Sequence, residues 1–251
     1  MKRILLTTVS LCALGFAAPA LAADLAAYKA APIVAATYDW SGYYVGVFGG
    51  YGYGNHNLNN ATGPAGFANF TTNYSSEGGI GGVEAGYNYQ SGNIVLGVEG
   101  DYSWSGINGN DNFGSTDAFG NASSDATSLR WSGTFRARGG IAVDRLLLFF
   151  TGGWAYGDLL HTNTDPVLGV DQFDNHRSGL TAGGGIAYAI TNNVIGKFEY
   201  RYYDFGTYTR AAVGSSGPTP NGQLPYNVAN TYSVVTLGLD FKFGGPVVAK
   251  Y

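Results

Sequence analysis

Apolar side chains alternate with small or polar ones in eight separate stretches of the chain. A period of two residues is typical of a β-strand whose two faces meet different surroundings. The predicted strands are Gly42–Tyr53, Gly79–Gln90, Ile94–Trp104, Leu129–Ala142, Leu146–Tyr156, Gly179–Ile190, Val194–Asp204 and Tyr232–Phe243. All eight prolines, which cannot donate a ladder hydrogen bond, fall outside these strands. The pattern predicts an all-β chain.

The connections between the predicted strands alternate between short and long. Three short turns are predicted at Ser91–Asn93, Val143–Arg145 and Thr191–Asn193. The long connections are rich in Asn, Asp, Gly, Ser and Thr and cover residues 54–78, 105–128, 157–178 and 205–231. Barrels of bacterial outer membranes combine an even number of antiparallel strands with short periplasmic turns and longer extracellular loops. A soluble barrel of the lipocalin kind would also fit this alternation.

The direction in which the apolar face of each strand points distinguishes an outer-membrane barrel from a soluble barrel. In residues 197–202 the even positions are aromatic and the odd positions are charged. In residues 235–243, Val, Leu and Phe alternate with Thr, Gly, Asp and Lys. A charge that faces lipid near the bilayer midplane costs roughly 2–4 kcal/mol, whereas an inward charge can be paired. We therefore predict that the apolar face points outward, and that the fold is an eight-stranded antiparallel up-and-down transmembrane β-barrel.

Charged residues of both signs gather on the predicted inward face. They are Glu84, Glu99, Asp101, Arg136, Arg138, Lys197, Glu199, Arg201, Asp240 and Lys242. The interior of an eight-stranded barrel is only wide enough for side chains to fill. We expect a lumen charge network of salt bridges and hydrogen bonds with a structural role. The alternative is a gated ion path in which Arg136, Arg138 and Arg201 select the ion.

Large aromatic side chains on the outward face are expected to form two girdles at the membrane interfaces. The predicted girdle residues are Trp40, Tyr43, Tyr51, Tyr89, Trp104, Trp131, Trp154, Tyr188 and Phe243.

The N-terminal residues predict export from the cytoplasm. Lys2 and Arg3 precede an apolar run, and Ala20-Leu21-Ala22 is a small-x-small cleavage site, as in a signal peptide. The expected organisation is a signal peptide at 1–22, a periplasmic linker at 23–39, the barrel at 40–243 and a C-terminal tail at 244–251. Cys12 is the only cysteine, so neither disulfides nor thiolate metal sites are expected after cleavage.

Composition and charge narrow the possible partners. Only 12% of the residues are charged, and the chain contains 40 Gly and 19 Tyr, which is unusual for a soluble globular protein. Without Lys2 and Arg3, 11 basic and 17 acidic residues remain, a net charge of −6. Nucleic acid is therefore not expected as a partner.

Three histidines are the candidates for metal or haem binding. His56, His161 and His176 fall in or beside the predicted long loops, with no carboxylate or cysteine at ligand spacing. We expect solvated loop side chains, no metal and no cofactor; haem capture by His56 or His161 is the alternative.

His176 and Ser178, two residues apart and predicted to face outward, are a candidate catalytic pair. The pair is similar to that of outer-membrane lipid A deacylases, in which His activates a Ser that faces lipid. Because no orienting carboxylate is evident nearby in the sequence, we expect no catalytic residues and no enzymatic activity.

Five runs of the sequence carry a family resemblance: Trp40–Gly46, Gly81–Gln90, Thr151–Asp158, Lys197–Gly206 and the ending Gly244–Tyr251. In these runs the chain resembles the small outer-membrane immunogenic β-barrels of alphaproteobacteria. The resemblance implies a surface-exposed, non-catalytic barrel; some members act as narrow porins or bind haem. Two positions depart from the family: Ala187 replaces an inward glutamate of many relatives, and the aromatic insertion signal is either Phe243 or Tyr251.

We expect a protein of the cell outer membrane with a structural or interaction role, which displays four extracellular loops. A narrow or gated porin, a haem-binding surface protein and a lipid A deacylase are the alternatives. The expected partners are outer-membrane lipid and lipopolysaccharide, and the barrel-assembly machinery during insertion. The sequence does not identify an external ligand of the loops.

Overall fold

The structure, a computed structural model, describes residues 38–60, 71–111, 115–116, 122–165, 169–210 and 226–244. The predicted signal peptide, most of the predicted linker and tail, and all eight prolines lie outside these residues. The chain divides into the units Met1–Ala36 and Thr37–Tyr251, and the second contains every described residue. Among the described residues, no helix has the length and apolar character needed to cross a membrane.

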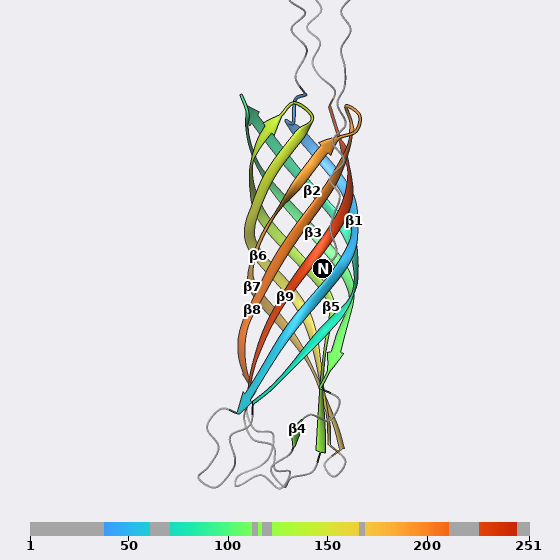
Figure 1. Ribbon diagram of the computed structural model, residues 1–251, viewed down its shortest axis with the longest axis vertical. Coiled ribbons are helices and arrows are strands. Elements are labelled where there is room, and N and C mark those ends of the chain that lie inside the picture. The colour runs from blue at the N-terminus through green and yellow to red at the C-terminus, as the bar shows by residue number, and fades with distance from the viewer. Residues whose placement is uncertain are drawn as a thin grey trace, which may run out of the picture. The chain divides into compact units, whose positions relative to one another are not determined.

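Eight long antiparallel strands close into a barrel (Figure 1). They are β1 (Gly42–Asn60), β2 (Thr71–Ser91), β3 (Ile94–Asn110), β5 (Ala122–Val143), β6 (Leu146–Asp165), β7 (Gly169–Ala189), β8 (Val194–Arg210) and β9 (Tyr226–Lys242). Consecutive long strands pair with one another, and β9 pairs with β1 to close the barrel. The short β4 (Ser115–Thr116) pairs with β5. The predicted fold class is confirmed.

The three predicted short turns join β2 to β3, β5 to β6 and β7 to β8. Gly92 and Asp144 have φ angles of 61° and 49° in two of these turns, a left-handed conformation that Gly and Asp adopt more readily than most residues. We call the barrel end with these turns the turn end, which lies at the top of Figure 1, and the opposite end the loop end.

The strands are longer than the sequence pattern predicted. β3 has 17 residues and β5 has 22, whereas a tilted strand crosses a bilayer in about 9–11. The predicted long loops were therefore too long, because most of their described residues continue the strands. The reason is visible at Asn55–Asn57, where both asparagines are exposed and His56 between them is buried. Polar residues at alternate positions here face outward from a barrel wall.

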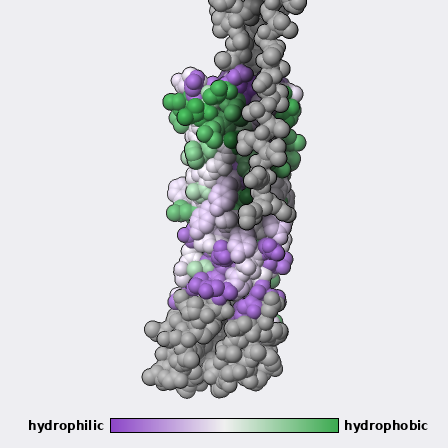
Figure 2. Space-filling model, in the orientation of Figure 1, coloured by the Kyte–Doolittle hydropathy of each residue, from purple (hydrophilic) through white to green (hydrophobic). Residues whose placement is uncertain are grey.

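The exterior changes character along the barrel. Toward the turn end the exposed side chains include Val47, Leu96, Ile141, Phe150 and Leu237, and we call this zone the apolar band. Toward the loop end the exposed side chains are mostly Asn, Ser, Thr and charged residues. On the face seen in Figure 2, hydrophobic residues gather near the turn end and hydrophilic ones near the loop end. The strand segments beyond the band, within residues 54–60, 71–78, 105–110, 122–130, 157–165, 169–178, 205–210 and 226–232, form what we call the projecting half.

The described interior contains two large apolar clusters and a small third one, the pair Tyr74 and Val228. The turn-end cluster consists of Tyr38, Trp40, Val95, Ala142, Leu147, Phe149, Ala187, Ala189 and Ile195. The loop-end cluster consists of Ile80, Ile107, Leu129, Ala155, Leu159, Tyr203, Phe205, Tyr232 and Val234. Along β8, the buried Lys197, Glu199 and Arg201 lie between Ile195 of the first cluster and Tyr203 of the second. A charged layer therefore separates the two clusters.

Candidate functional site

The ten residues predicted to line the lumen are all buried inside the barrel, with relative exposures from 0% for Arg136 and Glu199 to 9% for Asp101. They come from β2, β3, β5, β8 and β9. Strand alternation places them on the inward face, because cross-strand partners point to the same side of a sheet. Glu99 pairs directly with Arg136 in the β3–β5 register.

Arg136 is the centre of the charged layer. Its guanidinium lies 2.5 Å from Glu99, 3.1 Å from Asp101 and 2.6 Å from Glu199. These carboxylates come from β3 and β8, so one side chain of β5 connects strands that are not adjacent in the sheet. A planar guanidinium with five donors suits such multiple contacts.

Arg201 and Arg138 extend the network. Arg201 lies 3.0 Å from Glu199 and 3.2 Å from Asp101. Arg138 is 3.6 Å from Glu99, donates a 3.1 Å hydrogen bond to the Tyr44 hydroxyl and lies 3.8 Å from the ring centroid of Phe149.

Three carboxylates surround the ammonium group of Lys197. It lies 2.5 Å from Glu84, 3.9 Å from Glu99 and 3.8 Å from Glu199. The same three carboxylates have oxygens within 4.8 Å of one another, a spacing that could hold a metal ion. Because Lys197 contacts all three, the chain supplies a cation of its own to this cluster.

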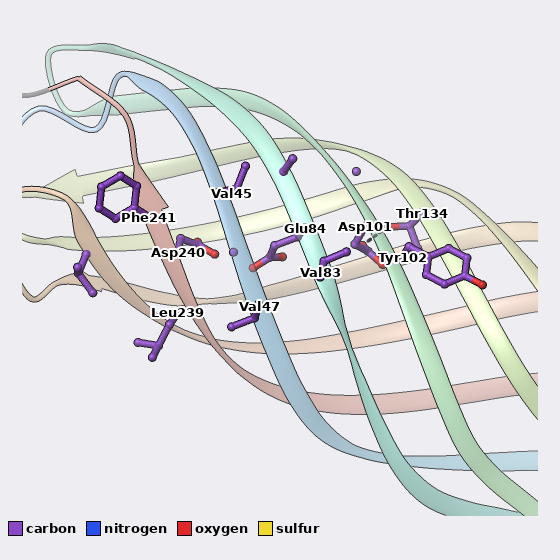
Figure 3. A pocket seen from close by; sticks show the side chains of 14 residues that line it. Val45, Val47, Val83, Glu84, Asp101, Tyr102, Thr134, Leu239, Asp240 and Phe241 are labelled. Carbon is purple, nitrogen blue, oxygen red and sulfur yellow. Dashed lines mark hydrogen bonds between the residues drawn. The ribbon is translucent and has the colours of Figure 1, made fainter.

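Glu84 of β2 and Asp240 of β9 are the two cross-strand partners of Gly46, and they flank β1 inside the barrel (Figure 3). A Cβ atom at Gly46 would collide with the Asp240 carboxylate, so the absence of a side chain there makes room for this carboxyl group. Figure 3 also shows the hydrogen bond from the Thr134 hydroxyl to Asp101. Lys242 lies apart from the network and donates to the carbonyl of Asp39 at the turn end.

Trp40 closes the turn end from inside, which corrects its predicted place in the aromatic girdle. It is 1% exposed, and its indole N–H donates a 3.0 Å hydrogen bond to the carbonyl of Asp144. Its backbone N–H donates to the side-chain carbonyl of Gln90 at 2.7 Å. Trp40 precedes β1, so strand alternation does not determine its direction, and its indole fills the apolar barrel mouth.

Tyr38 joins this closure although the sequence pattern gave no sign of it. Its backbone N–H donates to the Asp144 carboxylate at 3.1 Å, and its hydroxyl donates to the carbonyl of Asn192 at 3.2 Å. Burial raises the pKa of Tyr38 to about 12, against the opposing effect of Arg145, so the hydroxyl keeps its proton at neutral pH. Tyr38 and Trp40 contact each other edge to face, with ring centroids 5.0 Å apart.

The other predicted girdle residues point outward. Tyr43, Tyr51, Tyr89, Trp104, Trp154, Tyr188 and Phe243 are 50–68% exposed, and Trp131 is partly exposed. The predicted insertion signal at Tyr251 lies outside the described residues, and Ala187 is buried in the turn-end cluster.

The expectation of solvated loop histidines is wrong for two of the three. His56 is 1% exposed, and its ring nitrogens lie 2.7 Å from the Asn230 carbonyl oxygen and 2.8 Å from the Ser76 hydroxyl. His161 is 5% exposed, and its Nδ1 lies 2.7 Å from the Thr127 hydroxyl. Both lie on the inward face of the projecting half, where the sequence predicts loops. His176 is exposed, as expected.

His176 and Ser178 are both exposed on the outer face, and the structure adds a carboxylate that the sequence did not indicate. Asp158 is the cross-strand partner of His176 in the β6–β7 register. Asp158 is 3% exposed, and its carboxylate accepts a 2.9 Å hydrogen bond from Nε of Arg130. No spacing in the sequence could have revealed this group, because it depends on strand register.

Comparison with known proteins gives the family. The family model described as outer membrane protein beta-barrel domain matches residues 8–243. The 31 kDa outer-membrane immunogenic protein of Brucella melitensis is 33% identical over 97% of this chain and 100% of its own length. The 22 kDa outer membrane protein of Rhizobium leguminosarum is 31% identical over 66% of this chain and 64% of its own length.

Among solved structures, the outer membrane protein OprG of Pseudomonas aeruginosa aligns with 83% of this chain and 99% of its own, at 12% identity and a TM-score of 0.48. The matched domain and the named relatives agree with the closed barrel and its apolar band. This chain therefore belongs to the outer-membrane β-barrel family that includes the Brucella immunogenic proteins, and it resides in the outer membrane.

Proposed function

We propose that this protein is a closed, non-conducting barrel that anchors its loop end outside the cell and presents it for interaction. The observation that supports this is the burial of the charged layer, in which Arg136 and Glu199 are 0% exposed. A water-filled pore would wet such side chains. The alternative of a gated ion path has no support from a layer whose Arg136 and Arg201 are surrounded by carboxylates.

Two further layers support a closed interior. The turn-end cluster is closed by Trp40 and Tyr38, and the loop-end cluster contains Ile107 and Leu159, both 0% exposed. An ion on the barrel axis would have to cross both apolar layers, where losing its hydration is costly. The partners proposed for this role are outer-membrane lipid and lipopolysaccharide, with the barrel-assembly machinery acting during insertion.

Conductance in planar bilayers tests the closed interior. We expect the refolded wild-type protein to give no discrete current steps under conditions in which a general porin does. Reproducible steps from the wild-type protein, in proportion to the amount inserted, would contradict the proposal.

The orientation can be tested separately by cysteine labelling, because Cys12 is the only cysteine and lies in the predicted signal peptide. We expect Asn57→Cys, on the exposed projecting half, to react with a membrane-impermeant maleimide on intact cells. The matched variant Asn192→Cys, in an exposed turn, should react only after permeabilisation. The reverse result would place the turns outside.

A further inference from the structure

An ion pair lies on the outer face of the barrel at the boundary of the apolar band. Arg130 and Asp158 approach to 2.8 Å, with side-chain exposures of 44% and 5%. A bulge produces this arrangement, since the β5–β6 register passes from Leu129–Leu159 directly to Trp131–Asp158 and skips Arg130. Arg130 and Trp131 therefore both face outward, as such an irregularity can re-aim side chains.

Aromatic rings surround this ion pair. Trp131 stacks on Tyr102 with centroids 5.5 Å apart and an interplanar angle of 22°. Its centroid is 5.7 Å from that of Tyr156, and His176 lies 6.2 Å from Trp131 and 6.1 Å from Tyr156. We call Arg130, Asp158, Tyr102, Trp131, Tyr156 and His176 the rim patch.

The rim patch lies at the boundary between the apolar band and the projecting half. On β5 the outward Phe135 lies in the apolar band and is 60% exposed. Arg130 precedes it in the chain and lies closer to the loop end. A charge on the outer face costs several kcal/mol at the bilayer midplane and little at the interface. The rim patch is therefore at headgroup depth, and in the proposed orientation it faces the outer leaflet.

The charge at this depth differs around the barrel. On β2 and β8 the exposed charged residues near the boundary are Glu77 and Asp204, both acidic. On β1 the boundary residue is Tyr51, 56% exposed. Among the described side chains, the exposed guanidinium at the loop-end boundary is that of Arg130, so this side of the barrel presents a cation where β2 and β8 present acidic groups.

We propose that the rim patch binds the phosphorylated sugar headgroup of the outer-leaflet glycolipid. Arg130, held in place by Asp158, binds the phosphate, because a guanidinium forms strong charge-assisted hydrogen bonds with phosphate oxygens. Trp131 and Tyr156 contact the sugar rings with the faces of their aromatic rings. The inference rests on the proposed orientation, and it assigns the lipopolysaccharide partner to one position on the barrel.

The test measures binding of lipopolysaccharide to the refolded full-length mature barrel in detergent, for the wild type and four variants. We expect Arg130→Gln to weaken binding roughly tenfold, the loss of about one charge-assisted hydrogen bond. Trp131→Leu should also weaken binding, because it removes an aromatic contact with the sugar. Arg145→Gln removes a cation at the turn end and Tyr51→Leu removes an aromatic ring from β1; both should bind as the wild type does. Unchanged binding by Arg130→Gln and Trp131→Leu would overturn the proposal.

Two additional arms separate the glycolipid from other anions and from misfolding. Phosphatidylglycerol and dephosphorylated lipid A should bind more weakly to the wild type, and equal binding of either would overturn the headgroup assignment. The double variant Arg130→Gln/Asp158→Asn removes the ion pair without leaving a buried charge, and heat-modifiable gel mobility reports its folding. If cysteine labelling supports the orientation while lipopolysaccharide binding stays unchanged in all variants, only the rim patch proposal fails.

Discussion

The membrane half of this barrel, which carries the apolar band, differs from the projecting half in its exterior and in the position of its buried charges. In the membrane half the exterior is apolar, as at Val47 and Leu239, and the interior contains the charged layer around Arg136 as well as the turn-end cluster. In the projecting half the exterior is polar, as at Asn57, and the interior includes Ile107, Leu159 and Phe205 of the loop-end cluster. The same continuous strands thus follow the pattern of a membrane barrel over one half and of a soluble barrel over the other.

The surroundings of each wall segment, rather than the fold, determine which side chains that segment needs. Lipid demands apolar atoms outside, and the narrow interior then takes the polar groups. Water removes that demand, and the interior of the projecting half is filled by apolar contacts and a few hydrogen-bonded groups such as His56.

The largest effect is expected in the charged layer. Arg136→Met should lower the free energy of unfolding by about 3–5 kcal/mol, because buried carboxylates lose their partner. Arg136→Met/Glu99→Gln should be less destabilised than the single variant, since it restores the charge balance. Urea unfolding in detergent micelles measures both. Additive effects of the two substitutions would mean that water screens the layer, which would remove the contrast between the halves.

The exterior can be tested with one substitution at two heights on β1. Val47→Lys, in the apolar band, should cost roughly 2–4 kcal/mol in lipid bilayers, because its charge faces the hydrocarbon. Asn57→Lys, on the projecting half, should change stability by less than about 0.5 kcal/mol, as is usual for an exposed position. Unfolding from vesicles gives both values. Equal costs would show that the membrane boundary is elsewhere.

The free energy of unfolding should depend less on the buried polar groups of the projecting half than on the charged layer. His56→Ala leaves Asn230 and Ser76 without their partner and should cost about 1–3 kcal/mol. The exposed neighbour serves as the control, and Asn55→Ala is expected to cost less than about 0.5 kcal/mol. If the two variants unfold at the same urea concentration, residues 55 and 56 belong to a loop, as the sequence predicts, and not to the barrel wall.

The smallest effect is expected at the turn end, where Tyr38→Phe removes one hydrogen bond and should cost about 0.5–1.5 kcal/mol. Because the pKa of Tyr38 is raised to about 12 in the folded protein, its contribution should be constant below the unfolded value of about 10 and should decline as the pH rises toward 12. Unfolding at pH 7 and at pH 11 compares the variant with the wild type. A larger difference at pH 11 than at pH 7 would contradict this assignment.

The fold class and the direction of the membrane-half side chains could be predicted from the sequence alone. A period of two with one apolar face and one charged face is typical of a strand between lipid and a closed interior. The inward positions of Glu99, Arg136 and Glu199 follow from strand alternation. The short turns were also predictable, because each contains the Gly, Asp or Asn residues that tight turns favour.

Only the tertiary structure decided the features that depend on register or on long-range contacts. The projecting half looked like loop because Asn, Ser and Thr favour turns, and only cross-strand pairing gives them an outward position. Trp40 looked like a girdle residue because its burial depends on Asp144 and Gln90, far away in the chain. The rim patch depends on a bulge that moves Arg130 out of the ladder. Alternation is a local property, whereas register and closure are determined by the whole sheet.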